Sequence, residues 1–166
     1  MNSSFFNRRM LMGRLVAGLS AVGVGSLLAG SAEAKARDSG LRKLNRDGKA
    51  ADGTQMITAL ITHNGLLYIA GQGANSNGPV GNDDIDSHTT KVMENVKELV
   101  VTGGGTMDSI LQLTVYLADI AYYEPMNKIF KTYFPNGGPA RTTVAVAALP
   151  GNSKLEINCI AAIVRK

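Results

Sequence analysis

Two stretches near the carboxyl end decide the fold: Arg141-Thr-Thr-Val-Ala-Val-Ala-Ala-Leu-Pro150 and Lys154-Leu-Glu-Ile-Asn-Cys-Ile-Ala-Ala-Ile-Val164. Each has the β-branched and small apolar residues that are typical of strands. Gly151-Asn152-Ser153 lies between them and is suited to a turn. We therefore expect two adjacent strands that form a hairpin.

Successive side chains of a strand point to opposite faces. This alternation places Thr142 and Val144 on an apolar face and turns Arg141 away from it. In the second stretch, alternate residues of 155–161 are apolar and Glu156 points away from them. We therefore expect a cation and a carboxylate on neighbouring strands. A guanidinium can bind a substrate carboxylate with two parallel hydrogen bonds, and a carboxylate can orient or deprotonate a water. A surface ion pair is the alternative.

The apolar pattern upstream predicts the rest of a single domain. In chain order it indicates a strand over 55–61, a turn at 63–65, a strand over 66–70, a loop over 71–84, a helix from 86 to 103, a strand over 109–117 and a helix over 120–134. The order ββαβαββ is an α+β fold with both helices on one face of the sheet. The small side chains of Thr143, Ala145 and Ala147 suit an oligomer that covers the other face.

The amino-terminal residues have the pattern of a secretory signal. Arg8-Arg9 precedes a moderately apolar run over 15–28, and Ser31-Ala-Glu-Ala34 resembles a cleavage site. We expect residues 1–34 to be a twin-arginine signal peptide, 35–53 a polar linker or arm, and 54–166 the folded domain. The expected location is periplasmic or secreted, with membrane contact only during export; an uncleaved anchor is the alternative.

The charge balance argues against nucleic acid as a partner. Without residues 1–34, which hold three arginines and one glutamate, the charge is 14 − 12 = +2, against +4 for the whole chain. A protein that binds nucleic acid usually carries a larger basic surplus. The single cysteine, Cys159, excludes an internal disulfide, and its place on an apolar strand face predicts a buried thiol.

Metal and cofactor motifs are absent from the sequence. The glycine-rich segments 71–78 and 102–106 match neither a dinucleotide fingerprint nor a P-loop. His63 and His88 have no cysteine or carboxylate cluster at ligand spacing. We therefore expect no metal site and no cofactor.

Several segments, in this order, resemble the Rid (YjgF-like) family. They are 66–72, which resembles a family strand ending in Ser-Gly-Gln, 95–101 and 127–134, which resemble its two helices, and 139–150 with 155–161, which resemble its carboxyl-terminal signature. The resemblance covers roughly residues 55–166. It implies a chorismate-mutase-like fold, a homotrimer with clefts between subunits, and cofactor-free hydrolysis of 2-enamine and 2-imino acids to 2-keto acids and ammonia.

The same resemblance implies site residues. Arg141 is expected to bind the substrate carboxylate and Glu156 to place the attacking water, while Asn127, Ala70, Gly71 and Thr143 contact the substrate. The chain departs from the family pattern at four positions: Ala70 replaces Ser, Ile57 replaces Tyr, Thr143 replaces Cys and Asn158 replaces Glu. A trimer that only binds small carboxylates, or acts as a holdase, therefore stays open as the alternative. Family members have also been described as ribonucleases, which the charge balance disfavours.

Overall fold

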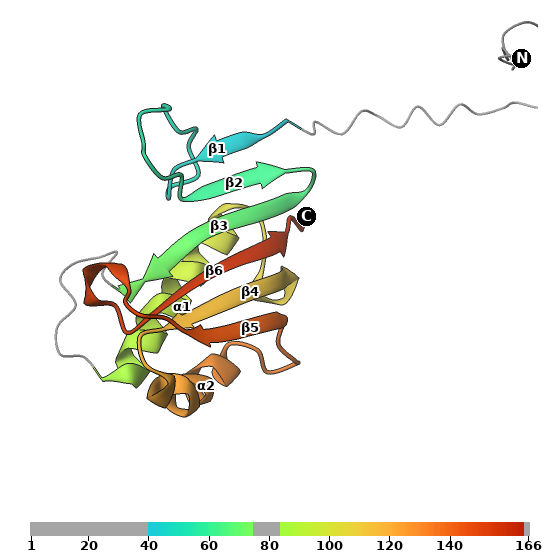
Figure 1. Cartoon of the computed structure of the whole chain (residues 1–166). Coiled ribbons are helices and arrows are strands. Elements are labelled where there is room, and N and C mark those ends of the chain that lie inside the picture. The colour runs from blue at the N-terminus through green and yellow to red at the C-terminus, as the bar shows by residue number, and fades with distance from the viewer. Residues whose placement is uncertain (1–39, 75–83, 165–166) are drawn as a thin grey trace, which may run out of the picture. The chain divides into compact units, whose positions relative to one another are not determined.

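The structure is a computed structural model, and it describes residues 40–74 and 84–164. Its elements are β1 (Arg42–Leu44), β2 (Leu60–His63), β3 (Leu66–Gly73), α1 (Ile85–Thr102), η2 (Met107–Ser109), β4 (Ile110–Leu117), η3 (Ile120–Tyr122), α2 (Tyr123–Thr132), β5 (Ala140–Ala145), η4 (Pro150–Asn152) and β6 (Leu155–Ala162). The predicted α+β fold is confirmed, with a mixed sheet and two helices (Figure 1). The predicted signal peptide, residues 1–34, lies outside the described residues.

The first predicted turn is confirmed. Asn64 and Gly65 have φ angles of 51° and 79°, the left-handed backbone that a two-residue hairpin loop requires. They join β2 to β3 in an antiparallel pair with His63 opposite Leu66.

The predicted hairpin between the last two strands is wrong. The six strands of the described residues lie in the order β1-β2-β3-β6-β4-β5, so β4 separates β5 from β6. α2 carries the chain from the end of β4 back to the start of β5, which makes those two strands parallel. β6 then pairs antiparallel with β3 on one side and β4 on the other. Figure 1 shows β6 in the middle of the sheet, with β5 at its edge.

A strand lies within the segment that we expected to be a linker. β1 pairs antiparallel with β2, and Leu44 joins the core with 5% of its surface exposed. Lys43 pairs with Ile61 in this register. At least this part of 35–53 therefore belongs to the sheet.

The core lies between the sheet and the helices. α1 buries the apolar side chains Val92, Met93, Val96, Leu99 and Val100. Asp84 caps this helix, because its carboxylate accepts a hydrogen bond of 2.7 Å from the Ser87 N–H. The buried His88 Nε2 accepts the Lys154 N–H at 3.1 Å, which ties α1 to the start of β6.

The other face of the sheet is not covered by any described helix. Tyr68 and Val144 lie on this open face and are 39% and 40% exposed. The register pairs Arg141 with Leu113 and Thr143 with Val115. Leu113 and Val115 are buried beneath the helices, so Arg141 and Thr143 point to the helix side.

Our assignment of the two faces of β5 is therefore reversed. Thr142 and Val144 point to the open face, and Thr143 and Ala145 do not. Ala147 lies beyond the end of β5. Within the two described ranges, no helix combines the length and the apolar composition needed to cross a bilayer.

Candidate functional site

The side chains predicted for the site form two groups on opposite sides of the sheet. Arg141 and Thr143 point from β5 to the helix side, where α2 carries Asn127. Glu156 points from β6 to the open face, and it lies against Gly71 of β3.

Two aromatic rings hold the Arg141 guanidinium. Its central carbon lies 4.6 Å from the centre of the Phe130 ring and 5.8 Å from that of Tyr123. One of its terminal nitrogens donates to the Tyr123 hydroxyl at 3.4 Å. Aromatic faces attract cations, so the rings keep the half-buried guanidinium in place. Asn127 lies one turn from each ring along α2, on the same side of that helix.

This group has unused hydrogen-bonding capacity. Asn127 Oδ1 and Thr143 Oγ1 are both buried without a hydrogen-bond partner among the described residues. No carboxylate in 40–74 or 84–164 forms an ion pair with Arg141. Buried polar groups in folded proteins are normally paired. The group is therefore suited to a ligand that supplies a negative charge and hydrogen-bonding groups.

A bulge in β3 forms the second group. The register runs from Ile69 opposite Cys159 to Gln72 opposite Ile157, so two residues, Ala70 and Gly71, face the single residue Asn158. An extra residue on one strand is the definition of a β-bulge. The Asn158 Oδ1 atom beside the bulge is buried and has no partner among the described residues.

Gly71 leaves room for the carboxylate of Glu156. A β-carbon at Gly71 would overlap Glu156 Oε1, and the next nearest atom is the carboxyl carbon at 2.8 Å. Only glycine therefore permits this position of the carboxylate. Within the described residues, Glu156 forms no ion pair.

Arg141 and Glu156 are far apart within one chain, which corrects our expectation of neighbouring strands. Arg141 is level with Cys159 across β4, whereas Glu156 is level with Val144. The offset of three residues and two strand spacings separates their backbones by about 14 Å. Their side chains also point to opposite faces of the sheet. The expected pairing failed because β4 lies between the two strands.

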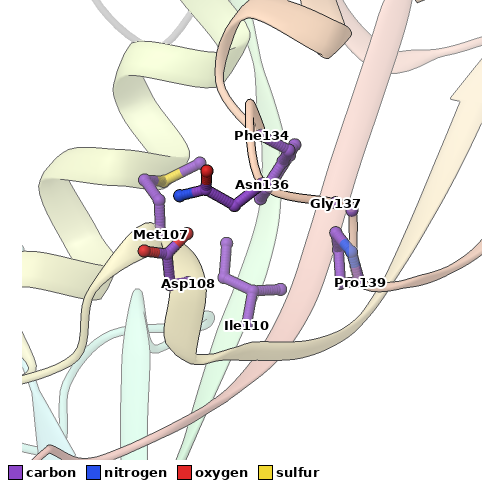
Figure 2. Close-up of a pocket in the computed structure, with 8 residues that line it drawn as sticks. Met107, Asp108, Ile110, Phe134, Asn136, Gly137 and Pro139 are labelled. Carbon is purple, nitrogen blue, oxygen red and sulfur yellow. The ribbon is translucent and has the colours of Figure 1, made fainter.

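A pocket of about 220 Å³ lies elsewhere, between η2 and the loop before β5. Its lining residues are Met107, Asp108, Ile110, Phe134, Asn136, Gly137, Gly138 and Pro139, and they include none of the predicted site residues. Figure 2 shows the Asp108 and Asn136 side chains turned toward one another. The Asp108 carboxylate would repel a carboxylate ligand, which favours the Arg141 group as the anion site.

No cluster of metal-ligating side chains occurs in the described part of the chain. Cys159 is confirmed as buried, with 4% of its surface exposed. Burial raises the pKa of its thiol to about 12, so the reactive thiolate is scarce at neutral pH.

Sequence reasoning missed three residues that support these groups. Tyr123 and Phe130 follow the helical spacing of core residues, and their spacing around Asn127 is the signal that indicates a shared face. Arg46 was overlooked because it lies in the expected linker. It donates to Gln72 Oε1 at 2.8 Å, next to the bulge.

Comparison with known families gives one match over most of the domain. The family described as endoribonuclease L-PSP matches residues 50–163. Reactive Intermediate Deaminase A of the Arabidopsis thaliana chloroplast is 38% identical over 86 residues, which are 52% of this chain and 46% of that protein. The chain thus spans about half the length of that relative. The mitochondrial protein mmf2 of Schizosaccharomyces pombe is 35% identical over 101 residues, 59% of this chain and 80% of that protein.

Solved structures show the same fold. Yeast Mmf1 superimposes with a TM-score of 0.66 at 27% identity, over 75% of this chain and 100% of that chain. The structure of E. coli TdcF with bound serine gives a TM-score of 0.65 at 26% identity, over 75% of this chain and 100% of that one.

Proposed function

The chain belongs to the endoribonuclease L-PSP family, and from this premise we propose that it is a cofactor-free deaminase of reactive 2-enamine and 2-imino acids. Its products are 2-keto acids and ammonia. Similarity to a reactive intermediate deaminase supports the reaction class.

The observation that carries the proposal is the Arg141 guanidinium, which is held by two rings and paired with no carboxylate of the described residues. A 2-imino acid offers the complementary carboxylate, bonded directly to the electrophilic C=N carbon. Binding of the carboxylate by the guanidinium therefore holds the C=N carbon within a few ångströms of Arg141.

The attacking water must then be oriented by a side chain close to that carbon, and Glu156 of the same chain is too distant. About 14 Å separates the two backbones, and the side chains diverge. We therefore place Glu156 of a second copy beside Arg141 of the first. The open face that carries Glu156 also exposes Tyr68 and Val144, which supports its burial against another subunit. The trimer implied by the family resemblance provides such an arrangement.

In this arrangement Glu156 orients the water for attack on the C=N carbon and accepts one of its protons. Glu156 passes this proton to the nitrogen, which gives a tetrahedral adduct with one hydroxyl and one amino group. The hydroxyl proton is then transferred to the amino group, the C–N bond breaks, and ammonia leaves as the C=O bond of the 2-keto acid forms. Asn127 Oδ1 and Thr143 Oγ1, which are unpaired in the described structure, are available to hydrogen-bond the substrate.

The second candidate function is binding of small carboxylates without turnover. Ala70, Thr143 and Asn158 depart from the pattern of the active family members, while Arg141 is kept. The structural similarity to TdcF, which was solved with bound serine, supports an amino acid or keto acid as the ligand.

The test compares wild type with Arg141→Ala on 2-imino acids generated in the cuvette by an amino-acid oxidase, with spontaneous hydrolysis subtracted. Loss of a charge-assisted contact worth about 1.5–3 kcal/mol lowers kcat/KM about ten- to hundredfold. Arg42→Ala removes an exposed arginine of β1 and is the matched control. Background rates in folded wild type, together with binding of a 2-keto acid by calorimetry, would establish the second candidate.

We also propose that the protein is exported by the twin-arginine route, on the order of Arg8-Arg9, the apolar run and the small-residue site. Fractionation of a host that has this route tests the proposal. Replacement of both arginines by lysine should retain the protein in the cytoplasm. Equal export of the two forms would contradict it.

A further inference from the structure

The bulge that supports Glu156 is itself held by a side chain. Gln72 Nε2 donates to the carbonyl oxygens of Ala70 at 2.7 Å and Gly71 at 3.1 Å. Gln72 is 4% exposed, so water does not compete effectively for these two bonds. The carboxamide thus fixes the backbone whose missing side chain makes room for the Glu156 carboxylate.

Arg46 fixes the orientation of that carboxamide. An amide can rotate by half a turn and exchange its oxygen and nitrogen, which would put an acceptor against the two carbonyls. The Arg46 guanidinium donates to Gln72 Oε1 at 2.8 Å, and a guanidinium has no acceptor. The amide nitrogen of Gln72 therefore stays directed at the bulge.

Arg46 is anchored on its other side by α1. Its second terminal nitrogen donates to Glu98 Oε2 at 2.8 Å. Surface ion pairs contribute little to stability by themselves, and both side chains are partly exposed. Through these contacts, one planar guanidinium joins the segment after β1, the end of β3 and α1.

We infer that Arg46 is a positioning residue for Glu156. Arg46 acts through Gln72, which holds the Ala70-Gly71 bulge in place. Its kinetic consequence rests on the function proposed above; its structural consequence does not. The contacts of Arg46 reach α1 and, through Gln72, the Ala70-Gly71 bulge, and they are separate from those of Arg141. Loss of Arg46 should therefore impair the placement of water and leave carboxylate binding intact.

The experiment combines Arg46→Met with Glu156→Gln in a double-mutant cycle. A small displacement of a reacting group can cost up to about a hundredfold, so we expect Arg46→Met to lower kcat about tenfold with little change in KM. It should lower kcat no further in the Glu156→Gln background. Lys49→Ala is the control, because it removes a surface ion pair in the same segment without touching Gln72. An equal loss of kcat in both backgrounds would overturn the inference.

A second readout does not depend on activity. Hydrogen exchange of residues 70–73 should become faster in Arg46→Met and stay unchanged in Lys49→Ala. Unchanged exchange in Arg46→Met refutes the positioning role, whatever the kinetics show. If wild type has no turnover, the proposed function fails and the exchange result alone decides the inference. Glu98→Gln, which weakens the anchor of Arg46, gives the same test with a smaller effect if Arg46→Met does not fold.

Discussion

Two impaired variants should restore activity to each other when they assemble together. Arg141→Ala subunits keep Glu156, and Glu156→Gln subunits keep Arg141. If each site takes its arginine from one subunit and its glutamate from another, a mixed oligomer contains some intact sites. The separation of about 14 Å between the two backbones, and their opposite side-chain directions, require this outcome for a deaminase that uses both groups.

The size of the effect follows from the geometry. In a random equal mixture, a site is intact when a subunit with Arg141 meets a subunit with Glu156 across the contact. Each condition holds for half of the subunits, so about one quarter of the sites are intact. Each pure variant should lose about tenfold or more, since one lacks the carboxylate contact and the other the water-orienting group. The mixture should therefore exceed both parents.

The assay uses co-expressed subunits with two different tags, purified in sequence so that only mixed oligomers remain. Keto acid and ammonia release is compared with pure Arg141→Ala, pure Glu156→Gln and wild type. Oligomers that each contain at least one copy of both variants are enriched in intact sites, so recovery should reach at least about one quarter. A mixed oligomer that is no more active than its parents refutes the placement of the site between subunits.

Two further predictions concern Gly71 and Cys159. Gly71→Ala places a β-carbon where Glu156 Oε1 lies, so the proposed activity should fall as far as in Glu156→Gln. The free energy of unfolding, measured in urea, should change by less than about 1 kcal/mol. A Gly71→Ala variant as active as wild type contradicts this account of the bulge. The pKa of the Cys159 thiol, raised by burial from 9.0 to about 12 in the folded protein, means that the folded state holds this proton more tightly. Stability should therefore fall as pH rises above about 9, by at most about 1.4 kcal/mol per unit, and urea midpoints of Cys159→Ala should lack this component of the slope.

The sequence predicts the helices, strands and turns of this fold better than it predicts which strands pair with each other. The Asn64-Gly65 turn, the helix that ends before Gly103 and the strand that begins after Ser109 all depend on local backbone preferences, which a sequence displays directly. The position of β6 depends on long-range pairing. Gly151 and Asn152 do have positive φ angles of 64° and 57°, yet the strands that they connect pair with β4 and not with each other.

The sequence predicts individual residues of the candidate site but not how they are arranged in space. The resemblance to the Rid family supplied Arg141 and Glu156, but alternation alone put Arg141 on the wrong side of the sheet. A charged side chain on the helix side of a strand breaks the usual pattern. It is accommodated here because the rings of Tyr123 and Phe130 lie against the guanidinium. This contact joins residues of a helix and an edge strand, which no local pattern reveals.

The strand β1 has a consequence for how copies of this chain meet. A sheet edge offers unpaired N–H and C=O groups to any extended segment and so invites aggregation. β1 covers the edge of β2, and it is only three residues long with Arg42 and Lys43 exposed. A short, cationic border of this kind repels a second border of the same charge. Copies of the protein are thereby discouraged from joining β1 to β1 into a continuous sheet.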